Sequence, residues 1–367
     1  MEKEYKENWE ETRKRFLKWW KRQEMDRPLL LVRAPKFRNL DFFPRELNTE
    51  VSAYQEVSKG NLVNIKKKWL DIFGIVDQTE KMFEQTAYLG GAFPYIIPYL
   101  GAGSFGTFLG ATPAFCPGTV WYKPCFQDID KVQLSLNHDS RWWKWSINFS
   151  KIAANRASGK YLVSIPDLIE NLDTLAALLG TDKLLYYLAD TPGEIHRLQR
   201  QLLPLWFEAF EEHYQIVKDF EGWNAFPTSV WGPGKTAKLQ CDFSSMISPA
   251  MFNEFVLPYL KEQSDRLDYT VYHLDGPGAL CHLDALLTID SLDCINWVPG
   301  AGQPDSGDSC WDKIYRKILD VGKGIQAFMD ASYVKDFVKR FGTKGVFIVT
   351  TSTTVEEGKE LIRDSHL

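Results

Sequence analysis

The last hundred residues of the chain repeat one pattern four times, and this repeat constrains the fold more than any other feature. Each repeat is a short apolar run followed by a segment with helical spacing of apolar residues. The predicted strands span 269–275, 293–299, 324–330 and 345–351, and the helices that follow them span 278–289, 309–321, 332–341 and 354–365. Parallel strands need crossover connections, so the repeat predicts a parallel sheet covered by helices.

The earlier part of the chain adds elements of both kinds. Apolar runs at 27–35, 160–167, 222–229 and 238–246 predict strands, and helical spacing is found at 5–24, 49–73, 140–158, 171–189, 192–220 and 248–267. The total of about eight strands predicts an α/β protein with one (β/α)8 TIM barrel. Residues 1–26 are then an N-terminal helical extension and residues 27–367 the barrel. An open doubly wound sheet is the alternative, although no GxGxxG motif follows the first strand.

Two helix starts and one long loop can also be predicted. Thr191 and Ser248 each precede a proline at a helix start, which is typical of an N-cap followed by proline at the first helical position. Residues 93–124 are rich in glycine, proline and aromatic residues and predict a strand, a long loop and a hairpin. Loops of this length inside a compact domain often carry function.

Composition excludes several classes of protein. The net charge is -5, and no basic stripe favours nucleic-acid binding. The charged start gives no sign of a signal peptide, and no apolar run reaches the length of a membrane span. Six scattered cysteines without a CxxC motif are typical of reduced thiols, so we expect a cytoplasmic protein. The 13 tryptophans can fill a core or line an apolar pocket.

If the fold is a barrel, the active site lies where the carboxyl ends of the strands meet. His273 and Asp275 end one predicted strand and share a face, because alternate residues of a strand point the same way. A carboxylate beside an imidazole can fix its tautomer and raise its basicity. We therefore predict a catalytic pair that acts as general acid and base or hydrogen-bonds a substrate. The alternative is a buried polar pair that caps the next helix.

Other residues at strand ends are candidates for substrate binding. They are Arg33, Asp167, Trp231, Cys241, Trp297 and Asp330. Arg33 follows an apolar run and is expected to meet an anionic partner. Cys241, next to Asp242, is either a ligand or nucleophile or a buried thiol. The two tryptophans either wall an apolar pocket or seal the core, whereas Cys281 and His282, in the following helix, are expected to be structural.

Five stretches of the chain resemble the uroporphyrinogen decarboxylase superfamily. They read DRPLLLVRAP, PYLGAGSFGTFLGA, LADTPGEIHRLQRQ, DFSSMISPAMFNEFVLPYLKEQSDRL and YTVYHLDGPGALCHLDALLTIDSLDCINWVPGAG. This superfamily includes the decarboxylase and methyltransferases of corrinoid (cobalamin) pathways. The resemblance implies a (β/α)8 barrel, in agreement with the periodicity.

The resemblance also bears on metals. The thiol-methylating branch binds zinc through a His-x-Cys at a strand end and a later cysteine near the last strand. Here His273 is present, but Asp275 stands at the cysteine position, and the last strand reads IVTTSTT. Zinc sites need about three protein ligands of suitable type, so zinc and other tightly bound cofactors are not expected. A different set, His273 with Cys241 or Asp275, is the alternative.

Three functions are compatible with these residues. The resemblance favours a methyltransferase that works with a corrinoid protein on a small methylated or methoxylated substrate. The first alternative is a decarboxylase, that is, a lyase. In it, Arg33 and Arg38 would hold carboxylates and Asp167 or Asp275 would act as the acid. The second alternative is a non-catalytic small-molecule binding protein. A homodimer is possible, because Trp9, Trp19 and Trp20 can pack on a second subunit or on their own barrel.

Overall fold

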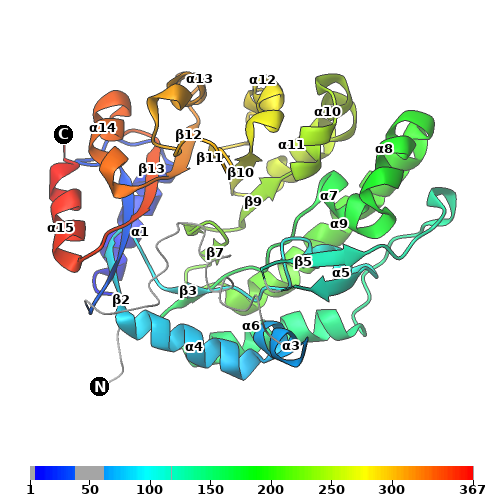
Figure 1. Cartoon of the computed structure of the whole chain (residues 1–367), viewed down its shortest axis with the longest axis horizontal. Coiled ribbons are helices and arrows are strands. Elements are labelled where there is room, and N and C mark those ends of the chain that lie inside the picture. The colour runs from blue at the N-terminus through cyan, green and yellow to red at the C-terminus, as the bar shows by residue number, and fades with distance from the viewer. Residues whose placement is uncertain (1–4, 38–61, 117, 367) are drawn as a thin grey trace.

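A parallel-rich sheet of seven strands forms the centre of the computed structural model, which describes residues 5–37, 62–116 and 118–366 (Figure 1). The strand order is β2-β1-β13-β12-β11-β10-β9, and only β2 runs antiparallel to its neighbour. The strands are β1 Leu29–Pro35, β2 Thr86–Gly90, β9 Thr236–Gln240, β10 Tyr269–Asp275, β11 Cys294–Val298, β12 Gly324–Phe328 and β13 Val346–Thr351. The four predicted βα repeats are confirmed.

Helices connect the strands and cover the sheet, with α12, α13 and α14 along one side of it in Figure 1. They are α1 Trp9–Trp20, α3 Leu62–Leu70, α4 Ile72–Gln85, α5 Ser104–Phe108, α6 Arg141–Ala157, α7 Asn171–Leu179, α8 Thr181–Asp190, α9 Pro192–Val217, α10 Pro249–Phe255, α11 Leu257–Asp265, α12 Leu283–Leu287, α13 Asp312–Asp320, α14 Ala331–Phe341 and α15 Val355–Asp364. Part of the predicted helix at 49–73 lies outside the described residues.

The helix ends show where local sequence decides the structure. Ser248 is the N-cap of α10 as predicted, since its hydroxyl accepts a hydrogen bond from the backbone N–H of Met251. Thr191 does not cap α9, because its hydroxyl donates to the Tyr187 carbonyl in the last turn of α8. The helix predicted at 171–189 is two helices, since Gly180 between them adopts a φ of 96°.

The hydrogen-bonded sheet does not close into the predicted eight-stranded barrel within the described residues. The short strand β6 Leu162–Val163 pairs with β3 Tyr95–Ile96, and β7 Asn224–Phe226 forms a hairpin with β8 Val230–Gly232. A single bridge between Ser164 and Ala225 links β6 to β7. Pro166 lacks an N–H group and ends the pairing of β6. The structure is thus an α/β fold with an open, parallel-rich sheet. The strands predicted at 160–167, 222–229 and 238–246 are present but shorter than predicted.

One side chain takes the place of a backbone ladder between β7 and β9. The amide of Asn224 donates to the Thr236 carbonyl at 2.8 Å and accepts from the Thr236 N–H at 3.1 Å. Both residues are fully buried. The side chain therefore bonds both backbone groups of Thr236, whose N–H also donates to the Gly234 carbonyl at 3.1 Å, and it holds β7 beside β9.

Helix α1 covers the amino-terminal ends of the strands. Phe16, Trp19 and Trp20 are buried in the main hydrophobic core. The indole N–H of Trp19 donates to the carbonyl of Gly345, directly before β13. Trp20 donates to the carbonyl of Trp231. Trp19 and Trp20 thus pack within their own chain, and the opposite, carboxyl edge of the sheet is free of this helix.

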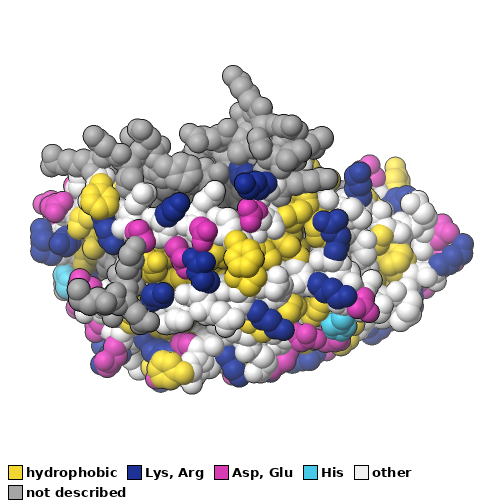
Figure 2. All heavy atoms as spheres, turned by 90° about the horizontal axis from the view of Figure 1, so that it is seen from below, with side chains coloured by type: hydrophobic (Ala, Val, Ile, Leu, Met, Phe, Trp, Pro, Cys, Tyr) yellow, Lys and Arg dark blue, Asp and Glu magenta, His cyan; other side chains and the backbone are white. Residues whose placement is uncertain are grey.

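The surface agrees with the mild net charge. On the face in Figure 2, basic and acidic side chains lie intermixed with scattered apolar ones. Arg156 of α6, for example, pairs with Asp77 and Glu80 of α4. Among the described residues, no helix has the length and apolar character needed to cross a membrane.

Replacing Asn224 by alanine is expected to lower the free energy of unfolding by about 1–3 kcal/mol, because the buried Thr236 carbonyl loses this donor and the Thr236 N–H keeps only its bond to the Gly234 carbonyl. Urea denaturation measures the change. The control is Asn155→Ala on the exposed face of α6, where a change within about 0.5 kcal/mol is expected. An equal effect of the two substitutions would contradict the bridging role of Asn224.

Candidate functional site

Three polar side chains converge at the carboxyl edge of the sheet, and we call them the strand-end cluster: Asp242, His273 and Asp275. One imidazole nitrogen and one oxygen of each carboxylate all lie within 4.8 Å of one another. His273 and Asp275 lie on β10, and Asp242 begins the 3-10 helix η3 Asp242–Met246 directly after β9. Because β9 and β10 are parallel neighbours, their ends bring these residues together.

A polar row behind the cluster orients His273. The parallel register places Gln240, His273, Asn296 and Gln326 side by side on four adjacent strands. The amide of Asn296 donates to the Gln326 backbone carbonyl at 3.3 Å, so its Oδ1 faces His273 Nδ1 at 2.7 Å. Nδ1 must then carry a proton and donate it. In neutral His273 this leaves Nε2 as the basic nitrogen, which is available to a substrate, a proton or a metal ion.

The buried Glu170 and the half-buried Asp173 hold the third member in place. The carboxylate of Asp173 in α7 accepts hydrogen bonds from the backbone N–H groups of Asp242 and Phe243, at 2.8 and 2.7 Å. Glu170 accepts from the N–H of Gln240 at 2.9 Å. Burial raises the pKa of Asp173 to about 8, with a further contribution from Asp242, and burial also raises the pKa of Glu170. The corner between β9 and η3 is therefore fixed by the start of α7.

Electrostatics give Asp275 the properties of a proton carrier. Burial raises the pKa of the Asp275 carboxyl group. The charge of His273 lowers this pKa, and the negative charge of Asp242 raises it further. A carboxyl group with a raised pKa next to an imidazole can take up and release a proton closer to neutral pH than an exposed aspartate.

Two of the predicted binding residues lie at the same edge but make their own contacts. Arg33 lies near the carboxyl end of β1, on the far side of β11, β12 and β13 from His273. Asp167 follows β6 and is buried against Lys238 of β9, with Nζ and Oδ1 2.7 Å apart. It lines a small cavity with Trp206 and Phe226. Asp167 is thus engaged by a cation of the chain itself.

The other four predicted binding residues do not join the cluster. Cys241 is buried, and burial raises the pKa of its thiol well above the usual value, so it remains a thiol. Trp297 pairs in register with Leu274, which puts it on the face opposite His273, packed on Trp311. Trp231 lies beside α1 at the amino-terminal side. Asp330 caps α14 by accepting from the Ser332 N–H at 2.9 Å.

The segment after β10 begins as a 3-10 helix, η4 Pro277–His282. His282 is buried, stacks on Phe252 and places Nε2 2.9 Å from the Ser244 carbonyl. These contacts agree with the structural role expected for it. Cys281, also expected to be structural, is exposed.

Sequence reasoning missed the supporting residues, although a signal existed. Parallel strands covered on both faces are almost entirely apolar, so a buried Asn296 in CINWV or Gln326 in GIQAF requires a hydrogen-bonding reason. Lys238 and Gln240 stand out in β9 in the same way. The sequence shows Asp242 only as the neighbour of Cys241. Its approach to His273 depends on the corner held by Asp173, which the sequence does not reveal.

The strand-end cluster has the donor chemistry of a divalent-cation site. It offers one imidazole nitrogen and two carboxylates, whereas the resemblance implied an imidazole and two thiolates. Zinc accepts histidine and carboxylate ligands, and the hydrogen bond from Nδ1 to Asn296 is the outer contact that a ligating histidine usually makes. The residues therefore fit a divalent cation. Asp242 would be the third ligand, which the sequence pattern alone did not identify.

Comparisons with known proteins bear on the fold. No protein-family model matches the chain, and no curated protein matches it either. Among solved structures, it is similar to a methyltransferase from Methanosarcina mazei, with a TM-score of 0.54 and 12% sequence identity. The match covers 96% of this chain and 98% of that one. At this identity the likeness is one of fold over nearly the whole length.

The raised pKa of Asp173 predicts that stability falls with rising pH. The unfolded state loses this proton near pH 3.8, whereas the folded state keeps it up to about pH 8, so folding binds a proton between these values. Asp173→Asn keeps an acceptor oxygen but cannot ionise. We expect the unfolding free energy of the wild type to decrease from pH 5 to pH 8 more steeply than that of this variant.

Urea denaturation at several pH values measures both slopes. The control is Asp182→Asn on the exposed start of α8, which should keep the slope of the wild type. Equal slopes for the wild type and Asp173→Asn would show that the buried proton is not held.

Proposed function

We propose that the chain is an enzyme that transfers a methyl group between a small methylated or methoxylated compound and a corrinoid carried by a partner protein. The observation that carries the proposal is the convergence of Asp242, His273 and Asp275 at the carboxyl edge of the sheet. In α/β folds this edge is where substrates bind. The fold shared with a methyltransferase structure supports the choice of reaction.

The chemistry expected of this chain is proton handling at the leaving group. When a methoxylated compound loses its methyl group, the bond between carbon and oxygen breaks and the oxygen keeps the electron pair. The corrinoid supplies the nucleophile that takes the methyl group. The leaving oxygen needs a proton or a positive charge at that moment. His273 holds a proton at Nε2 when it is charged, and Asp275, with its raised pKa, lies beside it.

A divalent cation would serve the same leaving group. Held by Asp242, His273 and Asp275, it would polarise the leaving oxygen as a Lewis acid. His273 would remain oriented by Asn296 in either case, since that hydrogen bond uses Nδ1 and leaves Nε2 for the proton or the cation.

The structure offers less support for decarboxylation than for methyl transfer. Arg33 lies at the carboxyl edge, but Arg38 lies outside the described residues. Asp167, the acid considered for that reaction, is buried and paired with Lys238. Methyl transfer therefore remains the function that the site supports best.

His273→Ala should slow methyl transfer by about 100-fold or more, because the leaving group loses its oriented proton donor or cation ligand. The assay mixes the purified chain with cob(I)alamin, as a stand-in for the partner's corrinoid, and a panel of methoxylated and methylated compounds. Loss of the cob(I)alamin absorbance reports the transfer.

The matched control is His366→Ala. His366 is exposed, and its Nδ1 lies 3.5 Å from Oδ2 of Asp26. Asp26 precedes β1, at the amino-terminal edge of the sheet. Full activity is expected for this variant. A panel without any turnover would refute methyl transfer, and equal rates for the wild type and His273→Ala would refute the role of the cluster.

A further inference from the structure

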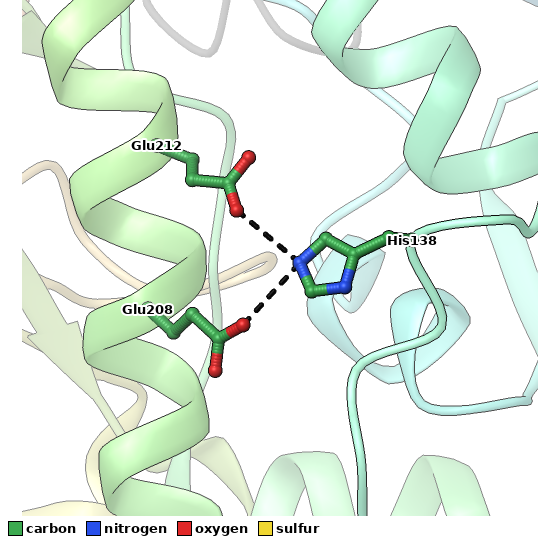
Figure 3. A group of neighbouring side chains, drawn as sticks. All are labelled: His138, Glu208 and Glu212. Atoms are coloured by element: carbon green, nitrogen blue, oxygen red, sulfur yellow. Dashed lines mark hydrogen bonds and ion pairs between the residues drawn. The ribbon is translucent and has the colours of Figure 1, made fainter.

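A second group of metal-ligating side chains lies away from the strand-end cluster, and we call it the α9 cluster: His138, Glu208 and Glu212. His138 comes from the segment between the 3-10 helix η2 Ile129–Lys131 and α6, and the two glutamates come from successive turns of α9. Figure 3 shows both carboxylates pointing toward one nitrogen of His138. The separations from Nε2 are 3.3 Å to Glu208 Oε1 and 3.2 Å to Glu212 Oε1.

These separations suit a shared metal ion. Two ligands each bound at about 2.0–2.1 Å to a tetrahedral zinc ion lie about 3.3–3.4 Å apart. A charge-assisted hydrogen bond between imidazolium and carboxylate is shorter, at about 2.7–2.9 Å. The two distances at Nε2 therefore match the edges of a metal tetrahedron better than they match two ion pairs.

Without a metal ion, the three side chains are held together only by a hydrogen bond and ion pairs at the surface. Glu208 and Glu212 are four residues apart on a helix, a spacing at which like charges repel. Nε2 carries at most one proton, which cannot serve both carboxylates well. All three side chains are 46% exposed, so an ion pair among them contributes little stability. A divalent cation would bind all three donors at once.

The imidazole is already held in position. Its ring packs edge-to-face on Trp143, with centroids 4.8 Å apart. Trp143 is in turn buried against Phe108 and His213. The segment that carries His138 is tied down by the N–H of Asn137, which donates to the Phe108 carbonyl at 3.0 Å. A donor fixed in this way loses little freedom when it binds an ion.

We propose that His138, Glu208 and Glu212 bind a divalent cation of the zinc type, with water completing its coordination. The ion fastens the segment before α6 to α9, about seventy residues later in the chain. We assign it a structural role, because it joins two distant segments of the chain and involves none of the strand-end residues. The proposal is independent of the proposed methyl transfer.

Isothermal titration of the chelator-treated full chain with Zn²⁺ tests the proposal. The parent protein is His273→Ala, so that binding at the strand-end cluster does not obscure the result. One zinc per chain is expected. Adding His138→Ala, or the pair Glu208→Gln and Glu212→Gln, should weaken this binding by about 100-fold or more, because one or two of three ligands are lost.

The melting temperature and a control variant provide two further tests of the site. Zinc should raise the Tm of the parent by at least about 2 °C, and this rise should vanish in both ligand variants. The control is Asp139→Asn, which removes a negative charge next to His138 but no ligand atom, and should keep the binding within about threefold. Unchanged zinc binding in the ligand variants, or an equal loss in Asp139→Asn, would overturn the site.

Discussion

The rest of the structure depends on the need of buried polar groups for hydrogen-bond partners inside an apolar sheet. Asn296 is fully buried in β11, where an amide without partners would cost several kcal/mol. It meets this need by joining Gln326 on one side and His273 on the other. The same two contacts fix the tautomer of His273 and leave Nε2 as its basic nitrogen. Stability and the orientation of the candidate site thus have a common cause.

The second constraint is the corner between β9 and η3. Asp173 and Glu170 occupy acceptor positions for the backbone of residues 240–243, and their removal from solvent raises the pKa of both carboxyl groups. This corner carries Asp242 to His273 and Asp275. Residues at the start of α7 therefore shape a site whose side chains belong to η3 and β10.

The sequence was sufficient to predict the repeated βα units and the pair of His273 and Asp275, because periodicity and alternate-residue geometry are local properties. It could not predict that β6 and β7 would be short and joined by one bridge, since that depends on Pro166 and on Asn224 replacing a backbone ladder. Trp231 and Trp297 show the same limit. The sequence places both at strand ends, but the face on which each lies depends on register and on α1.

The central claim is that substrates bind at the strand-end cluster beside His273. The most direct test is an NMR titration of the chain with ¹³C-labelled histidine, in which the six imidazole signals are assigned with His-to-Ala variants. The titrant is a methyl donor that supports cob(I)alamin methylation. If substrates bind there, the His273 signal shifts with donor concentration while the His366 signal stays unchanged. A saturable turnover with an unmoved His273 signal would place the substrate elsewhere and contradict the account.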